Sequence, residues 1–201
     1  MHSWREALVH IGIMTIGLFI ALSLEGLIEY FHHKELVHQA RENIRRELED
    51  NHKAAQGNLS SLAQNGDKVK AGLVTLRFMQ AHPDAHDQSI SYSLQFSSLD
   101  DAAWRTARDT GALGYMSYDE VQRYAGIYGF QASISDRATD ILTREAETLA
   151  PIMAHDGHFE KIPGNEYDEM MLKSAKNYMD VTLLQQFVRE LDGQYADTLK
   201  H

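Results

Sequence analysis

Histidine and glutamate side chains are concentrated in one short stretch of the chain, where they could bind a metal ion or protons. The stretch holds Glu25, Glu29, His32, His33, Glu35 and His38. On a helix, four of these residues would share one face, and two pairs have the Glu-x-x-His spacing of di-iron bundles. Those bundles draw ligands from four helices, and no second acidic helix near the membrane is evident here unless the protein oligomerises. We therefore favour an interfacial belt at a membrane surface, and keep Glu29, His32 and His33 as metal candidates.

A second group of metal-ligating residue types follows a long predicted helix. It comprises His82, Asp84, His86 and Asp87. Imidazole and carboxylate side chains at this density suit zinc or a similar ion. Segments that join helices are polar in any case, so His82 and His86 are candidates on composition alone. His155 and His158 have less support, and His10 is interpreted as a ring that reaches lipid head groups.

No familiar catalytic motif accompanies these histidines. The sequence has no Gly-x-Ser-x-Gly, P-loop, dinucleotide-binding fingerprint or His-Glu-x-x-His. It contains no cysteine, which excludes disulfides, thiolate metal sites and cysteine nucleophiles. The net charge of −10 argues against nucleic acid as a partner, because no basic stripe could offset the phosphates. We expect neither enzymatic activity nor a bound cofactor.

The element that would position the first histidine group is a membrane-spanning helix. Arg5 and Glu25 bracket a nearly charge-free run, LVHIGIMTIGLFIALSL. The distance between these charges along a helix is about 30 Å, which matches the hydrocarbon thickness of a bilayer. Trp4 and Tyr30 lie outside the two ends, where aromatic rings favour the head-group region. Residues 1–33 are therefore predicted to form a single transmembrane anchor.

Two alternatives stay open for this segment. Ala21-Leu22-Ser23 loosely resembles the cleavage site of a secretory signal peptide, although the predicted helix continues past it without a breaker. A buried soluble helix is the other alternative, because strictly apolar residues run only from Ile11 to Leu24. Gly17 and Ala21 are spaced to let two anchors approach closely. The residues assigned to the anchor are Trp4, Arg5, Gly12, Gly17, Ala21 and Glu25.

The orientation of the anchor is indicated by two opposing signals. Lys34, Arg41, Arg45 and Arg46 outnumber Arg5, which favours a cytoplasmic location for the rest of the chain. An N-terminal span after a short tail more commonly exports the domain on its C-terminal side. We expect a single-pass protein of the bacterial inner membrane with its larger domain in the periplasm.

Residues 34–201 are predicted to form one helical stalk and bundle domain. Leu36, Ala40, Ile44 and Leu48 repeat every four residues among charged side chains and form an apolar stripe on the stalk. No other segment is obviously placed to cover this stripe, so we expect it to bind a partner or a second copy. The predicted fold is all-α: a transmembrane helix that continues into a long stalk helix, then an antiparallel helical bundle with one short extended segment.

Local signals predict where several elements begin. Ser117, with Glu120 three residues later, forms a capping box, so a helix should start there. Asp100 is expected to cap a short helix that runs through Arg108, and Asn165 to start the last long helix. The alternation of Ile90, Tyr92, Leu94 and Phe96 with polar residues predicts a strand with one buried face, which we expect to lie across the bundle.

A membrane helix rich in Ile, Gly, Leu and Ala runs into a charged stalk, and the chain later carries Trp104, Thr110-Gly111-Ala112-Leu113 and Tyr124 to Tyr128. In these features the chain resembles an uncharacterised family of bacterial single-pass membrane-anchored α-helical proteins. The resemblance covers the first fifty residues and the region from Trp104 to Tyr128. It implies a bacterial single-pass helical protein and no mechanism.

We therefore expect an interaction or structural protein, held at a membrane by one helix. It would act as an oligomer or as an accessory subunit of a larger membrane complex. Its expected partners are the lipid bilayer and a second copy or another membrane protein. The alternative is a metal- or small-ligand-binding sensory helical domain, against which the missing second span counts.

Overall fold

The computed structural model describes residues 4–82, 89–90 and 94–200. In this part of the chain the fold is all-helical, with four α-helices and no β-strand. The elements are α1 (Trp4–Ala81), α2 (Ala102–Asp109), η1 (Ala112–Tyr115), α3 (Tyr118–Ala154), η2 (Phe159–Lys161) and α4 (Gly164–Thr198). The two η elements are short 3₁₀-helices.

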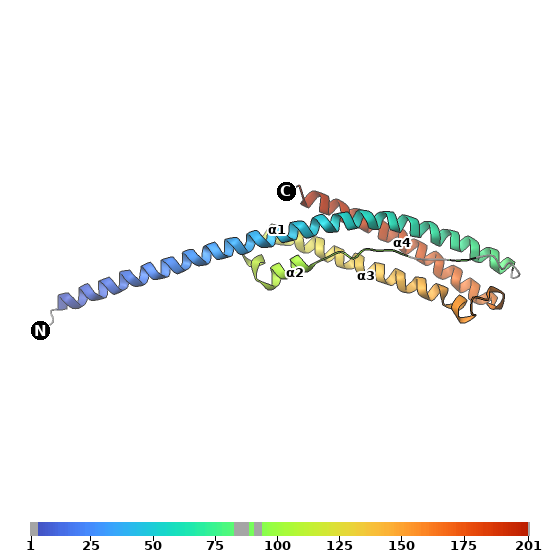
Figure 1. Cartoon of the computed structure of the whole chain (residues 1–201), viewed down its shortest axis with the longest axis horizontal. Coiled ribbons are helices and arrows are strands. Elements are labelled where there is room, and N and C mark those ends of the chain that lie inside the picture. The colour runs from blue at the N-terminus through green and yellow to red at the C-terminus, as the bar shows by residue number, and fades with distance from the viewer. Residues whose placement is uncertain (1–3, 83–88, 91–93, 201) are drawn as a thin grey trace.

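Helix α1 is one continuous helix of 78 residues (Figure 1). At 1.5 Å per residue it is about 117 Å long. No proline occurs before Pro83, so nothing in the sequence removes a backbone donor along its length, and it ends at Ala81 as the sequence predicted. The first part of α1 projects alone, and the remainder packs against the rest of the chain.

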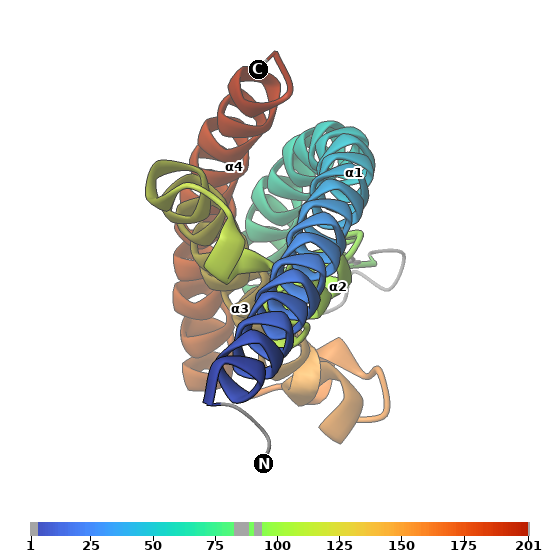
Figure 2. The same cartoon turned by 90° about the vertical axis from the view of Figure 1, so that its left-hand side faces the viewer.

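Helices α3 and α4 lie alongside the distal part of α1 (Figures 1 and 2). Helix α3 runs toward the distal end of α1, and α4 returns in the opposite direction. Helix α4 packs directly against both α1 and α3. The interior is filled by fully buried aliphatic side chains from all three helices, among them Ile44, Leu62, Val69, Ile134, Leu184 and Leu191.

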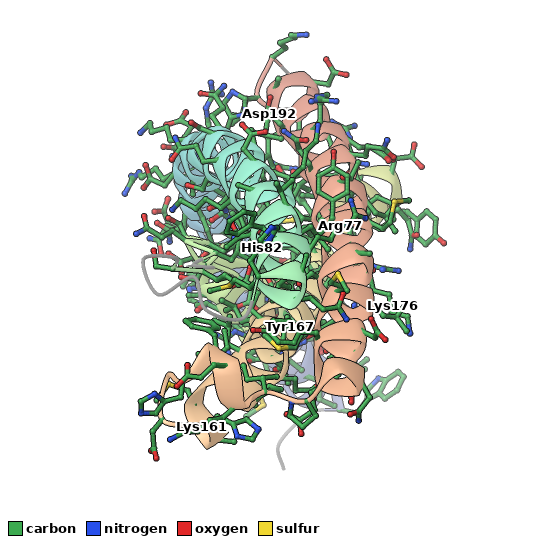
Figure 3. All side chains as sticks on the ribbon, turned by 90° about the vertical axis from the view of Figure 1, so that its right-hand side faces the viewer. Arg77, His82, Lys161, Tyr167, Lys176 and Asp192 are labelled. Carbon is green, nitrogen blue, oxygen red and sulfur yellow. The ribbon has the colours of Figure 1, made fainter. Side chains whose placement is uncertain are left out.

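A second apolar cluster closes the distal end of the molecule. It contains Leu76, Met79, Ile162, Tyr167 and Met170. Figure 3 views this end, with His82 at the end of α1 and Tyr167 near the start of α4. The Tyr167 hydroxyl donates to the backbone carbonyl of Phe159 over 3.0 Å, which ties η2 to α4.

One predicted helix start is confirmed and two are wrong. Ser117 caps α3, since its Oγ accepts a hydrogen bond from the Glu120 N–H over 3.3 Å. Helix α2 begins at Ala102 after Asp101, and no side chain at the N-cap position caps it. Helix α4 begins at Gly164, with Pro163 at the N-cap and Asn165 already inside the helix.

The predicted strand is absent from the described residues. Leu94 is buried and Phe96 is partly buried, while Ile90 packs against the distal cluster. Tyr92 lies outside the described residues. Residues 94–100, here called the strap, follow the long direction of the helices without regular secondary structure.

Candidate functional site

Three asparagines on α1 point into the protein interior at intervals of seven residues. Asn51, Asn58 and Asn65 are each no more than 3% exposed. Seven residues bring a helix almost to the same face after two turns, so the three amides form a line along one side of α1. Burial of an amide is unfavourable unless its donors and acceptors are paired. The strap provides the partners of Asn51 and Asn58, and Glu145 of α3 accepts from Asn65.

The first two asparagines each pair with a single residue of the strap. The Asn51 Nδ2 donates to the Asp100 carbonyl over 2.7 Å, and its Oδ1 accepts from the Asp100 N–H over 2.8 Å. Asn58 repeats this arrangement with Ser97, at 2.9 and 2.7 Å. Each amide therefore satisfies the backbone donor and acceptor of one residue, as a neighbouring strand does in an antiparallel ladder.

The spacing of the two pairs follows from backbone dimensions. Asn51 and Asn58 are about 10.5 Å apart along the helix axis, at 1.5 Å per residue. Ser97 and Asp100 are separated by about 10 Å if the strap rises 3.3 to 3.4 Å per residue. Seven helical residues thus match three extended ones, and the strap runs antiparallel to α1.

The third position of the line uses a buried carboxylate. Asn65 Nδ2 donates to Glu145 Oε1 on α3 over 2.9 Å, and Glu145 Oε2 accepts from the Leu94 N–H over 3.2 Å. Asn177 of α4 donates to Glu145 Oε1 over 3.4 Å. Among the described residues, no cation pairs with Glu145, so N–H donors alone offset the loss of its hydration.

The strap also contacts α3 at its other end. Gln131 Nε2 donates to the Asp100 carbonyl over 2.9 Å, and Gln131 Oε1 accepts from the Tyr195 hydroxyl over 2.7 Å. Burial raises the pKa of Tyr195, because ionisation would leave a phenolate in the interior. The strap therefore lies between α1 and α3 and is hydrogen-bonded to both.

Glu47 continues the line toward the anchor and caps α2. Its carboxylate accepts the N–H groups of Ala103 and Trp104 over 2.7 and 3.4 Å, and the Tyr128 hydroxyl over 2.7 Å. Asp100 does not cap α2, because Asp101 occupies the N-cap position and makes no side-chain cap hydrogen bond. A carboxylate from another helix thus supplies the negative charge that a helix N-terminus favours. Burial, and the hydrogen bond to Glu47, raise the pKa of Tyr128.

These side chains bind the backbone of an extended segment of the same chain. The groups involved are amides, carboxylates and tyrosine hydroxyls, and most of their partners are backbone N–H and C=O groups of residues 94–104. Trp104 lies in the capped first turn of α2, and its ring stacks on Tyr128 with centroids 5.4 Å apart. The site therefore holds the strap and α2 in one register on α1.

The residues assigned to the anchor lie on the part of α1 that projects alone. Trp4 is 77% exposed, and Ala21 and Glu25 are exposed. Gly12 and Gly17 have no atom close to the position that a Cβ would occupy. Arg5 lies in the same helix. Helix α1 is the one helix in the described part of the chain that is long and apolar enough to cross a membrane.

The expectation that the stalk stripe is uncovered is wrong. Ala40, Ile44 and Leu48 are buried within the chain, and Leu36 packs against the same core. The polypeptide returns toward the anchor twice, so that α2 with η1 and the end of α4 reach the first turns of the stalk. The lengths of the later helices, read from the sequence, do not show that the chain folds back to cover the stalk stripe.

The rings of His32 and His33 have centroids 6.1 Å apart, but the described candidates do not converge on one metal site. His33 faces Glu29 over 3.9 Å, His32 is exposed, and the His82 ring is 3.0 Å from the carbonyl of Phe78 in its own helix. His86 lies outside the described residues. Within the described ranges, no three His, Asp or Glu side chains are grouped as a metal site would require.

The asparagine line is missing from the sequence-based predictions, although a signal was present. Asn51, Asn58 and Asn65 continue the seven-residue spacing of the buried Ile44, and the buried Leu62 lies four residues after Asn58 at the second position of the same seam. A polar residue that recurs at a seam position indicates a specific buried partner. Glu47 offered no comparable signal.

No family model, curated protein or solved structure matches the chain.

Proposed function

We propose that this protein is a membrane-anchored helical interaction protein, an oligomer or an accessory subunit of a larger membrane complex. The bilayer would be the bacterial inner membrane, with the bundle in the periplasm. One observation carries the proposal: α1 contains both an apolar segment that no described residue covers and one of the three long helices that form the core.

The exposed segment is too large and too apolar for a surface in water. Every described side chain from Leu8 to Phe31 is exposed, including Ile13 and Phe19, each at 65%. Soluble monomers rarely expose continuous apolar patches of more than a few hundred Å². Lipid tails, or lipid tails together with other transmembrane helices, would remove this cost.

The same helix supports an interaction role. Helix α1 passes from the anchor into the bundle without a break, so a contact made in the membrane fixes the position of the bundle. Because the stalk stripe is internal, we place the partner on the anchor, where exposed apolar side chains are continuous along the helix. Gly17 and Ala21 lie four residues apart on one face of it, and neither has a side chain larger than a methyl group, as at sites where two membrane helices approach closely.

Cysteine cross-linking in native membranes tests this proposal, since the chain has no cysteine of its own. Ala21→Cys should form an oxidant-dependent dimer, or a covalent adduct with a partner. Phe19→Cys, about 160° around the same helix, is the matched control and should not. If neither variant cross-links, and mild-detergent purification from the host yields the chain alone with the mass of a monomer, the proposal fails.

A further inference from the structure

The 3₁₀-helix η1 lies beside the first turn of the stalk. The rings of Tyr115 and His33 stack with centroids 3.8 Å apart and an interplanar angle of 18°. His33 follows Ile28 by five residues, which corresponds to about 7.5 Å along the helix. The exposed apolar side chains of α1 continue past Glu25 to Leu27 and Ile28. For a hydrocarbon region that ends at Ile28, η1 lies at the level of the lipid head groups, which extend a further 5 to 8 Å or so on each side of the hydrocarbon core.

Exposed aromatic rings gather at this level. Tyr115 and Tyr118 are 53% and 75% exposed, and Tyr30 is 61% exposed. In water, the exposed apolar surface of these rings would be unfavourable. In the head-group region, a tyrosine places its ring against lipid and its hydroxyl in water, so this location is favourable.

A pocket of about 320 Å³ opens between η1 and α1 at the same place. It is lined by Tyr30, His33, Lys34, Val37, Arg41 and Tyr115. The buried Val37 provides an apolar surface, and the tyrosine rings flank it. The pocket thus combines aromatic and aliphatic walls with two basic side chains.

The charges in the pocket favour an anionic group. Arg41 is held by Glu120 through two hydrogen bonds of 2.7 Å, so its charge is balanced and its position fixed. Among the described residues, Lys34 forms no ion pair, and its ammonium group is exposed beside the pocket. Lys34 therefore supplies a net positive charge, whereas the Glu29 carboxylate lies next to His33 on the side toward the span.

We propose that this pocket binds the phosphodiester of a membrane phospholipid, with Lys34 as its cationic contact and the rings of Tyr30 and Tyr115 against the glycerol backbone. The inference rests on the proposed membrane anchoring, since the pocket meets lipid only if α1 spans the bilayer. A bound head group would fix η1 and α2 against the membrane surface.

Native mass spectrometry of the full chain, released from detergent with added phosphatidylglycerol, tests the site. The wild type should retain one lipid molecule preferentially. Lys34→Gln should lower the affinity for the lipid about tenfold, the effect of one lost charge-assisted contact. Tyr115→Ala should lower it as well, because the pocket loses an aromatic wall. Tyr115→Phe should retain it. Lys70→Gln, an exposed change on the distal part of α1, is the matched control and should bind like the wild type.

The possible results distinguish failure of the pocket proposal from failure of the proposed membrane anchor. If Lys34→Gln and Tyr115→Ala bind lipid like the wild type while both remain in carbonate-washed membranes, the pocket proposal is overturned and the anchor stands. If millimolar inorganic phosphate displaces the lipid, the site takes free phosphate and the lipid assignment is wrong. Release of the wild type itself by carbonate would contradict the anchor. Lys34 is exposed, so its variant stays informative even if Tyr115→Ala fails to fold.

Discussion

Asn51 and Asp100 exchange two hydrogen bonds, one in each direction between a side-chain amide and the backbone of a single residue. Asn58 and Ser97 repeat the exchange three strap residues away. A shift of the strap by one residue would break both pairs and remove Leu94 from the core. The asparagine line therefore fixes the register of the strap, and through it the position of α2 and η1 near the anchor.

Replacement of Asn58 by Ala should destabilise the bundle by about 1–3 kcal/mol, because the N–H and C=O of Ser97 would lose their partners in a part-buried position. Urea denaturation of the detergent-solubilised chain, followed by circular dichroism, measures this change. Gln64→Ala, on the exposed side of the same helix, is the matched control and should stay within about 0.5 kcal/mol of the wild type. Equal effects of the two variants would show that the strap is not held by Asn58.

Removal of the Glu47 carboxylate should loosen α2 more than it loosens the bundle. Glu47→Ala leaves the N–H groups of Ala103 and Trp104 and the Tyr128 hydroxyl without an acceptor. In a Trp4→Phe background, Trp104 is the remaining tryptophan, and its emission should shift to longer wavelength. Glu49→Ala should leave the spectrum unchanged, and an unchanged spectrum in Glu47→Ala would refute the cap.

The pair between Glu120 and Arg41 should make stability sensitive to acid. The hydrogen bond from Arg41 holds the pKa of Glu120 below its ordinary value of 4.5. A lowered carboxyl pKa stabilises the fold above the unfolded-state value, and this contribution is lost as the pH falls through the folded-state value. Glu120→Gln should therefore reduce the difference in unfolding free energy between pH 7 and pH 3, by less than about 1 kcal/mol because the pair is partly screened. Glu49→Gln should leave that difference close to the wild-type value.

The side of the membrane on which the bundle lies can be measured with a single cysteine. Lys176 is exposed on α4 (Figure 3), and Lys176→Cys would be the one thiol in the chain. For a periplasmic bundle, a membrane-impermeant maleimide should label it in intact cells with a permeabilised outer membrane. Labelling only after lysis of the inner membrane would place the bundle in the cytoplasm.

Local sequence signals predicted part of this structure. The apolar run before Glu25, the capping residue Ser117 and the end of α1 before Pro83 depend on residues close in sequence, and the structure agrees with each. These features follow from hydropathy, one side-chain hydrogen bond and the fixed geometry of proline.

The contacts that cover the stalk could not be predicted in the same way. Ile44 and Leu48 are buried because the chain returns to them from far along the sequence, and no periodicity encodes that return. The strap failed to form the predicted strand because its backbone partners are the side chains of Asn51 and Asn58 rather than a second strand. Hydrophobic alternation indicates a buried face and does not identify the donor that pairs with the backbone.

Alkaline carbonate extraction of native membranes tests most directly whether α1 joins the bundle to a bilayer. The wild-type chain should remain in the membrane pellet. A variant with Ile16→Lys and Phe19→Lys, both at exposed positions of α1 and therefore harmless to the bundle, should move to the supernatant, because each lysine costs about 2.5–3.5 kcal/mol at the centre of a span. Intact wild-type protein in the supernatant would contradict the membrane anchor and the interaction role built on it.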